Sequence, residues 1–369
     1  MPVTDFQHPD DFFSCYIPAH TVDFTEPGEV DARLEITDNF LEKHPIKDVG
    51  FEFVSFERKL GKAFLDTQEQ GFRHMKDAIE TTHDTKVHAS LHFPHKVDDR
   101  YSLATKNNEK LLAMLEQIVA LSNTIGIKVI VLHAGENITR GCWMQVKNNH
   151  EYKRKKLGEI ATTLGGMVDI MERDGYEGSI SLENMPWPFD VPGFSLTNML
   201  PSDFDYIFSR LEEQGITKGE EIGVCVDLCH SWILSKAAIA AREIQTRKDI
   251  HWEPPGIFSR EREEFMKLQD PIWFSSHLLE CINHVHVADS SGSIVVGDSG
   301  EILSQPTEGE ELGKGEFSAS PRFSESLALI ATGLKEDHKL ICTLEIKDED
   351  FMNPVNTKRS LEALHHLFK

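Results

Sequence analysis

The stretch Gly223-Val-Cys-Val-Asp-Leu-Cys-His-Ser-Trp232 decides the fold of this chain. It opens with a short apolar run, closes that run with Asp227, and continues into a helical pattern with no loop between the two. Strands that are apolar without alternation are covered on both faces, as in a parallel sheet flanked by helices. The stretch therefore predicts a strand followed by a helix, with Asp227 at the carboxyl end of the strand.

The same strand-then-helix unit recurs along the chain. Apolar, β-branched runs predict eight strands, at residues 13–18, 48–54, 87–93, 128–133, 179–183, 222–227, 284–288 and 340–346. Helical periodicity predicts helices between them, at residues 107–125, 155–171, 202–213, 321–334 and 357–368. Such units close into a (β/α)8 TIM barrel, and we expect residues 1–369 to form a single domain of this kind. No Gly-x-Gly-x-x-Gly motif follows the first strand, which argues against a dinucleotide-binding sheet.

Three loops are longer than ordinary strand-to-helix connections. They cover residues 184–200, 241–269 and 290–317, and each follows a predicted strand, the second after one further helix. Loops after barrel strands lie at the C-terminal face, so at least two of these should extend that face. Glu136 and Trp187, in or beside such loops, are expected to line either the substrate cavity or the loop rims.

Composition narrows the classes of function. The net charge of −23 counts against a nucleic-acid partner, because phosphate backbones bind to basic faces. A basic run at residues 153–156 is interpreted as the solvated side of a helix. The six cysteines are scattered through apolar runs, which predicts reduced thiols. No apolar run reaches the length of a membrane span and residues 1–13 are polar and acidic, so we expect a soluble, cytoplasmic protein without membrane contact.

Six of the predicted strands carry an ionisable residue at or near their carboxyl ends. These residues are His92, His133, Glu183, Asp227, His286 and Glu345. Strand ends on this side of a barrel face the active site, so side chains far apart in the sequence converge there. A single histidine at such a position is often only a hydrogen-bonded rim residue, whereas an unpaired buried carboxylate is costly. Together, three imidazoles and three carboxylates predict a site for a divalent cation such as Zn²⁺ or Mn²⁺.

Neighbouring residues extend the predicted site. His230 lies three residues after Asp227, at the start of the next helix, where both side chains can face one cavity. His230 would then be a second ligand or a proton donor, and the alternative is that Asp227 only caps the helix. His95 competes with His92 as the ligand at its strand end. Asp289 is expected to orient a ligand histidine.

These motifs resemble a known family. The segments are LHF (91–93), VLHAGE (131–136), SLENMP (181–186), GVCVDLCHSW (223–232), HVHVADS (284–290), LGKGEF (312–317) and LEI (344–346). They resemble the xylose-isomerase-like TIM barrel superfamily and, within it, the endonuclease IV branch. The resemblance runs from about His92 to the C-terminus, and GVCVDLCHSW is its most specific segment.

The resemblance implies roles for the matching residues. The metal-binding quartet shared by sugar isomerases, epimerases and endonucleases corresponds to Glu183, Asp227, His286 and Glu345. His92 and His133 match the ligands of a further zinc ion in the endonuclease branch. His230 matches a ligand of the third zinc ion there, and a substrate-contacting histidine in the epimerases.

One element of the endonuclease branch is missing. That branch has an Asp-Arg-His element before its LGxG turn, which supplies two ligands to the third zinc ion. This chain has Thr307-Glu-Gly-Glu-Glu311 there. A complete trinuclear site would therefore need Glu308, Glu310 or Asp298 as a substitute.

Two enzyme classes fit this site. The favoured one is an isomerase or epimerase of a small sugar or polyol, dependent on one, two or three divalent ions, with an enediolate as the intermediate. Glu183 and Glu345 would then form an acid–base pair and His230 a further catalytic group. The alternative is a zinc-dependent endonuclease for abasic DNA, which His92 and His133 favour and the net charge disfavours. A barrel that merely binds a ligand is the least favoured, since the ligand set looks intact.

Overall fold

The structure is a computed structural model, and it describes residues 13–54, 62–94, 103–104, 108–133, 137–187, 194–246, 252–298, 301–334 and 339–367. Its centre is a closed barrel with the strand order β1-β12-β9-β8-β6-β4-β3-β2, and every neighbouring pair is parallel. The barrel strands are β1 (Tyr16–Val22), β2 (Asp48–Val54), β3 (Lys86–His92), β4 (Val129–His133), β6 (Ser179–Glu183), β8 (Ile222–Asp227), β9 (Ile282–Val287) and β12 (Leu340–Leu344). The predicted (β/α)8 fold is confirmed.

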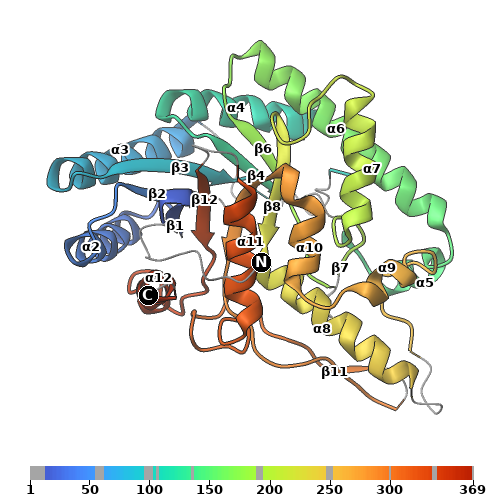
Figure 1. Cartoon of the computed structure of the whole chain (residues 1–369). Coiled ribbons are helices and arrows are strands. Elements are labelled where there is room, and N and C mark those ends of the chain that lie inside the picture. Colours follow the sequence, from blue (N-terminus) through green and yellow to red (C-terminus); the bar gives the residue numbers. More distant parts are fainter. Residues whose placement is uncertain are drawn as a thin grey trace.

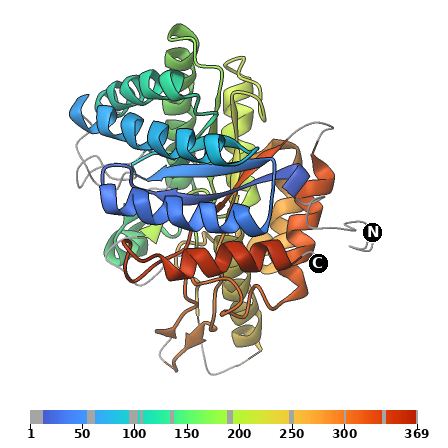
Figure 2. The ribbon, with the colours of Figure 1, turned by 90° about the vertical axis from the view of Figure 1, so that its left-hand side faces the viewer.

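The helices form an outer layer around these strands (Figure 1). The longer ones are α2 (Pro27–Lys43), α3 (Lys62–Thr82), α4 (Glu109–Ile125), α6 (His150–Arg173), α7 (Pro201–Glu212), α8 (Leu228–Gln245), α11 (Pro321–Gly333) and α12 (Val355–His366). Shorter helices are α5 (Arg140–Val146), α9 (Arg262–Lys267), α10 (Pro271–Leu278) and the 3₁₀ turn η1 (Leu279–Cys281). In Figure 2, α12 lies beside α2, so the last helix packs against the first strand–helix unit.

Local sequence explains how these helices begin and end. In α4, Leu111, Leu115, Ile118 and Val119 are buried on one face, as the helical period requires. The helix stops at Gly126, which adopts φ +79° and donates its backbone N–H to the carbonyl of Ser122. That left-handed conformation favours glycine because it has no Cβ.

The long loops contain small sheets of their own. The antiparallel pair β5 (Asn137–Ile138) and β7 (Phe194–Ser195) joins the loops after β4 and β6. The hairpin β10 (Val295–Val296) and β11 (Ile302–Ser304) lies in the loop after β9 and projects from the barrel in Figure 1. All of these loops follow the carboxyl ends of barrel strands, so they extend the face at which the ionisable residues lie.

Further predictions can be compared with the structure. The first strand begins at Tyr16, three residues later than predicted, and runs through Val22. The interpretation of residues 153–156 as a solvated basic run is wrong for Lys153, whose side chain is only 1% exposed. All six cysteines are free thiols. Among the helices of the described ranges, none is both long and apolar enough to cross a membrane.

Candidate metal centre

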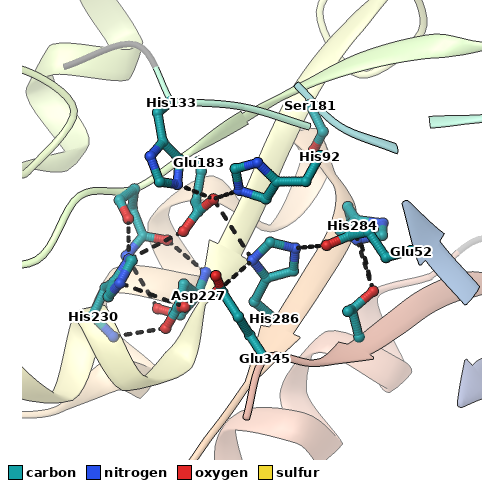
Figure 3. Close-up of polar contacts among 12 residues, drawn as sticks. Glu52, His92, His133, Ser181, Glu183, Asp227, His230, His284, His286 and Glu345 are labelled. Carbon is teal, nitrogen blue, oxygen red and sulfur yellow. Dashed lines mark hydrogen bonds and ion pairs between the residues drawn. The ribbon is translucent and has the colours of Figure 1, made fainter. Parts of the chain in front are cut away.

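The barrel brings the predicted residues together at the carboxyl ends of its strands (Figure 3). His92, His133, Glu183 and Asp227 are the last residues of β3, β4, β6 and β8. Strand register aligns His133 with Glu183 and Asp227 with His286, which places these pairs at the same height in the barrel. Glu345 directly follows β12 and lies beside His286.

Four of these side chains form one compact cluster. Glu183, Asp227, His286 and Glu345 each offer a ligand atom, and these atoms all lie within 4.8 Å of one another. His286 Nδ1 lies 3.2 Å from Glu345 Oε2 and 3.6 Å from Glu183 Oε2. Three carboxylates and an imidazole nitrogen directed at a common point form a ligand set that Zn²⁺ and Mn²⁺ accept.

A second cluster shares Glu183 with the first. His92, His133 and Glu183 also bring their ligand atoms within 4.8 Å of one another. The Nε2 atoms of His92 and His133 lie 3.2 and 2.9 Å from Glu183 Oε2. Glu183 therefore lies between two groups of ligand atoms, so the geometry has room for a second cation beside the quartet. His95, the alternative to His92, lies outside the described residues, as does Glu136.

Asp227 caps the next helix and His230 also faces the cavity, so the two alternatives given for this pair both hold. The backbone N–H of His230 donates to Asp227 Oδ1 over 2.7 Å, so Asp227 caps α8. The imidazole of His230 nevertheless faces the cluster, because its Nδ1 lies 3.2 Å from Glu183 Oε1 and 2.8 Å from the carbonyl of Asn184. Capping thus fixes Asp227 at the edge of the cavity without turning His230 away from it.

Glu308 is one of the residues that could substitute for the missing endonuclease ligands, and it lies beside His230. Its Oε1 lies 3.5 Å from His230 Nε2 and 3.5 Å from Lys347 Nζ. Burial alone would raise the pKa of Glu308, but His230 and Lys347 lower it to about 2. Glu310 points elsewhere and accepts a hydrogen bond from Ser291 Oγ, while Asp298 is exposed near the end of the β10–β11 hairpin.

Electrostatics at the quartet favour a bound cation. Within the described part of the chain, neither lysine nor arginine pairs with Glu183, Asp227 or Glu345; their ion-pair partners are histidines. Burial, together with the charges of Glu183 and Glu345, raises the pKa of Asp227 to about 7 even though His230 opposes the shift. Glu183 Oε1 and His286 Nδ1 are buried and, within the described ranges, make no hydrogen bond. These unsatisfied atoms and crowded carboxylates fit the ligand shell of a divalent ion.

Asp289 does not orient a ligand histidine, so that prediction is wrong. Its carboxylate instead accepts hydrogen bonds from the backbone N–H groups of Gly313, Gly315 and Ser318 over 2.8 to 3.0 Å. Asp289 therefore fixes the LGKGEF turn against the end of β9.

Trp187 is 1% exposed and packs edge-on against Trp252, with 5.9 Å between the ring centroids, so it belongs to the packing between two loops.

The sequence analysis missed Glu52. This residue lies in the middle of β2, is fully buried in the barrel interior and contacts both His284 and His286. The criterion of an ionisable residue at the end of a strand does not identify Glu52, because Glu52 precedes the end of β2 by two residues. A usable signal was present, since Asp-Val-Gly-Phe-Glu-Phe-Val places a carboxylate inside an otherwise apolar strand, where it needs a partner.

Fold and site together define a (β/α)8 barrel with a carboxylate–histidine cluster at its strand ends. The family model described as "xylose isomerase-like TIM barrel" matches residues 44–319. The chain belongs to this family.

Solved structures with a similar fold were found at low sequence identity. A D-tagatose 3-epimerase-like protein aligns with TM-score 0.54 and 17% identity over 94% of this chain and 96% of that one. A 3-keto-D-glucoside 4-epimerase from E. coli aligns with TM-score 0.52 and 13% identity over 95% and 98%. A xylose isomerase domain protein from Planctomyces limnophilus aligns with TM-score 0.53 and 13% identity over 95% and 94%. A comparison with curated protein sequences finds no match for this chain.

Proposed function

We propose that this protein is a divalent-metal-dependent isomerase or epimerase that acts on a small sugar or polyol-type substrate. The observation that carries the proposal is the quartet Glu183, Asp227, His286 and Glu345. Its first three residues are buried and Glu345 is partly exposed, and its carboxylates have no lysine or arginine partner among the described residues. Membership of the xylose isomerase-like family supports it. The similarity in fold to a D-tagatose 3-epimerase-like protein and to a 3-keto-D-glucoside 4-epimerase also supports it.

The quartet is the set of residues that would hold the ion, with Zn²⁺ or Mn²⁺ as the expected metals. A bound divalent cation supplies Lewis acidity, because it polarises a substrate carbonyl and stabilises the negative charge that develops on its oxygen. The residues of the chain contribute by fixing the ligand geometry in a buried cluster, where electrostatic interactions are stronger than in water.

Glu183 and Glu345 are the proposed acid–base pair. Both have an Oε2 atom near His286 Nδ1, at 3.6 and 3.2 Å, so the two carboxylates converge on the same region of the cavity. One carboxylate would remove the proton from the carbon beside the substrate carbonyl, and the other would return a proton. Return to the neighbouring carbon gives isomerisation, and return to the opposite face of the same carbon gives epimerisation.

His230 is proposed to act on a substrate oxygen. Its Nδ1 faces Asn184 and Glu183, while its Nε2 lies 3.5 Å from Glu308 and 3.7 Å from Asp227. Burial alone would lower the pKa of His230, but Asp227, Glu183 and Glu308 raise it well above its ordinary value. A protonated His230 could donate to a hydroxyl or carbonyl oxygen of the substrate, with Glu308 beside it as a second polar contact.

A zinc-dependent phosphodiesterase that cleaves abasic DNA is the second candidate. The cluster of His92, His133 and Glu183 favours it, because two ions that share a carboxylate can clamp the attacking and leaving oxygens of a phosphodiester. The net charge of −23 opposes it, and Glu308 and Glu310 stand where the endonuclease branch has Asp-Arg-His.

Deuterium exchange tests the proposed reaction most directly. The protein, loaded with Mn²⁺ or Zn²⁺, is incubated in D₂O with a panel of ketoses and their 3- and 4-epimers, and also with a duplex that contains an abasic site. Incorporation of solvent deuterium into a sugar, together with formation of its isomer or epimer, supports the proposal. Cleavage of the duplex without exchange into any sugar would replace it by the nuclease alternative.

A further inference from the structure

A second polar layer lies directly beneath the quartet, inside the barrel (Figure 3). At its centre is Glu52 of β2, which is fully buried. Its Oε2 accepts hydrogen bonds from Ser90 Oγ and His284 Nε2, each over 2.9 Å, and Thr343 Oγ1 lies 3.3 Å away. Its other oxygen, Oε1, lies 3.1 Å from His286 Nε2.

The groups around Glu52 are hydroxyls and imidazoles. These groups compensate its burial, since neither lysine nor arginine contacts Glu52 in the described ranges. A buried carboxylate oxygen without a donor costs free energy, and Oε1 makes no hydrogen bond within the described ranges, so a proton on His286 Nε2, 3.1 Å away, offsets part of this cost.

His286 is the residue that joins the two layers. Its Nε2 faces Glu52, and its Nδ1 faces Glu183 and Glu345 in the quartet. Nε2 of His286 and Oε1 of Glu52 are buried, lie 3.1 Å apart and, within the described ranges, make no hydrogen bond to any other group. Carboxylate oxygens lie near both nitrogens, at 3.1 Å from Nε2 and 3.2 Å from Nδ1, so a lone pair is unfavourable at either one while no cation is bound. A cation held by the quartet would take the place of a proton on Nδ1, whereas Nε2 would keep its proton opposite Glu52.

We propose that Glu52 is a positioning residue that holds the proton of His286 on Nε2 and so directs the Nδ1 lone pair toward the divalent cation. The inference rests on the proposed function in one respect, that the quartet binds a cation. Carboxylate–histidine–metal arrangements raise the basicity of the ligand nitrogen and fix the plane of the ring. Here the carboxylate comes from a strand far away in the sequence, because Glu52 and His286 are 234 positions apart.

The two oxygens of Glu52 contact different residues, and this difference provides a matched control. Ser90→Ala removes a hydrogen bond to Oε2 at the same depth in the barrel and leaves the contact between Oε1 and His286 in place. Glu52→Gln removes the negative charge and presents either an amide NH₂ or a weaker acceptor to His286. A role in packing alone predicts similar effects for the two variants, whereas a positioning role predicts an effect on metal affinity for Glu52→Gln alone.

The first experiment measures the dissociation constants of Zn²⁺ and Co²⁺ by competition titration for apo wild type, Glu52→Gln and Ser90→Ala, with the melting temperature of each. We expect Glu52→Gln to weaken binding by about 10- to 100-fold, with a changed Co²⁺ absorption spectrum. Ser90→Ala should stay within about threefold of wild type. Equal affinities for Glu52→Gln and wild type would overturn the proposal.

The second measurement keeps the proposal testable where Glu52→Gln does not fold or where the wild type binds no metal. The ¹⁵N and ¹H resonances of the imidazole of His286 are recorded in the wild type, with and without Zn²⁺. A proton on Nε2, shifted downfield and protected from exchange, is expected in both samples. A proton on Nδ1 with none on Nε2 would contradict the role of Glu52. Absence of metal binding or of sugar turnover would contradict the proposed function. The position of the proton on His286 would still test the role of Glu52 independently.

Discussion

Two buried polar clusters in this barrel differ in the source of their positive charge. Outside the strands, Lys153 of α6 lies 2.7 Å from Asp203 and 2.8 Å from Glu261, and all three side chains are at most 8% exposed. This triad joins α6, α7 and the turn before α9. Its lysine pairs with both carboxylates, so each of them has a cationic partner within the chain.

The strand-end quartet has three carboxylates and no cation of this kind. Its partners within the described residues are histidines, which carry charge only when protonated. Where the chain supplies a lysine, the cluster ties elements together. Where it supplies only ligand atoms, we propose that the cluster binds a cation from solution.

The largest expected effect breaks the functional cluster at Glu183. Glu183→Gln removes a carboxylate that faces both groups of ligand atoms, so turnover should fall by about 10⁴-fold while the fold persists. Deuterium exchange into the sugar substrate measures turnover, and thermal unfolding checks the fold. The control is Glu177→Gln, because Glu177 is 87% exposed and lies just before β6. Full turnover in Glu183→Gln would show that the site is assigned wrongly.

The next effect breaks the structural cluster at Lys153. Lys153→Met leaves Asp203 and Glu261 buried without their cation, so the free energy of unfolding should fall by about 3–5 kcal/mol. Chemical denaturation measures this loss. Lys155→Met on the same helix is the control, because its side chain is 63% exposed and its change should stay within about 0.5 kcal/mol. Metal affinity should be unchanged in both variants. A weaker metal affinity in Lys153→Met would show that the two clusters do not act independently.

Cation binding should stabilise the protein through the ligand atoms around Glu183. At a free Zn²⁺ or Mn²⁺ concentration about 100-fold above the dissociation constant, binding adds about 2.7 kcal/mol to the free energy of unfolding. Thermal unfolding with and without a chelator measures the gain. Wild type and Lys155→Met should gain equally and Glu183→Gln should gain little. An equal gain in Glu183→Gln would place the cation elsewhere.

The smallest expected effect concerns pH. Burial alone would lower the pKa of Lys153, but Asp203 and Glu261 outweigh burial and raise it above 10.5. A group whose pKa is raised by folding contributes its full stability below the unfolded pKa and loses it only as pH rises through the folded one. The stability difference between wild type and Lys153→Met should therefore stay constant from about pH 7 to about pH 9. A decline within that range, measured by denaturation, would mean that the lysine is not held as a cation.

The sequence alone was sufficient for most of the fold and for the quartet. The strands β2, β6 and β8 have the predicted bounds, because each is rich in apolar residues and ends at a clear boundary. The first strand was placed too early because Pro18 and His20 interrupt its apolar pattern, although both are paired within the barrel. A parallel barrel brings strand ends together whatever their spacing in sequence, and for this reason Glu183 and Glu345 could be grouped from the sequence.

The residues that sequence analysis misjudged are those whose partner comes from a distant element. Lys153 looks like its exposed neighbours in a basic run, and only α7 and the turn before α9 make it a buried cation. Glu52 lies within a strand, and its importance depends on His284 and His286 far along the chain. Asp289 follows His286 by three residues, yet its carboxylate accepts hydrogen bonds from the LGKGEF turn.

Equilibrium dialysis of the apo protein against Zn²⁺ or Mn²⁺, followed by elemental analysis, tests the central claim most directly. Wild type and Glu177→Gln should each retain at least one ion per chain, and Glu183→Gln should lose the ion that the quartet holds. Wild type that retains no ion, or Glu183→Gln that retains as many as wild type, would contradict the assignment of the strand-end quartet as a metal centre.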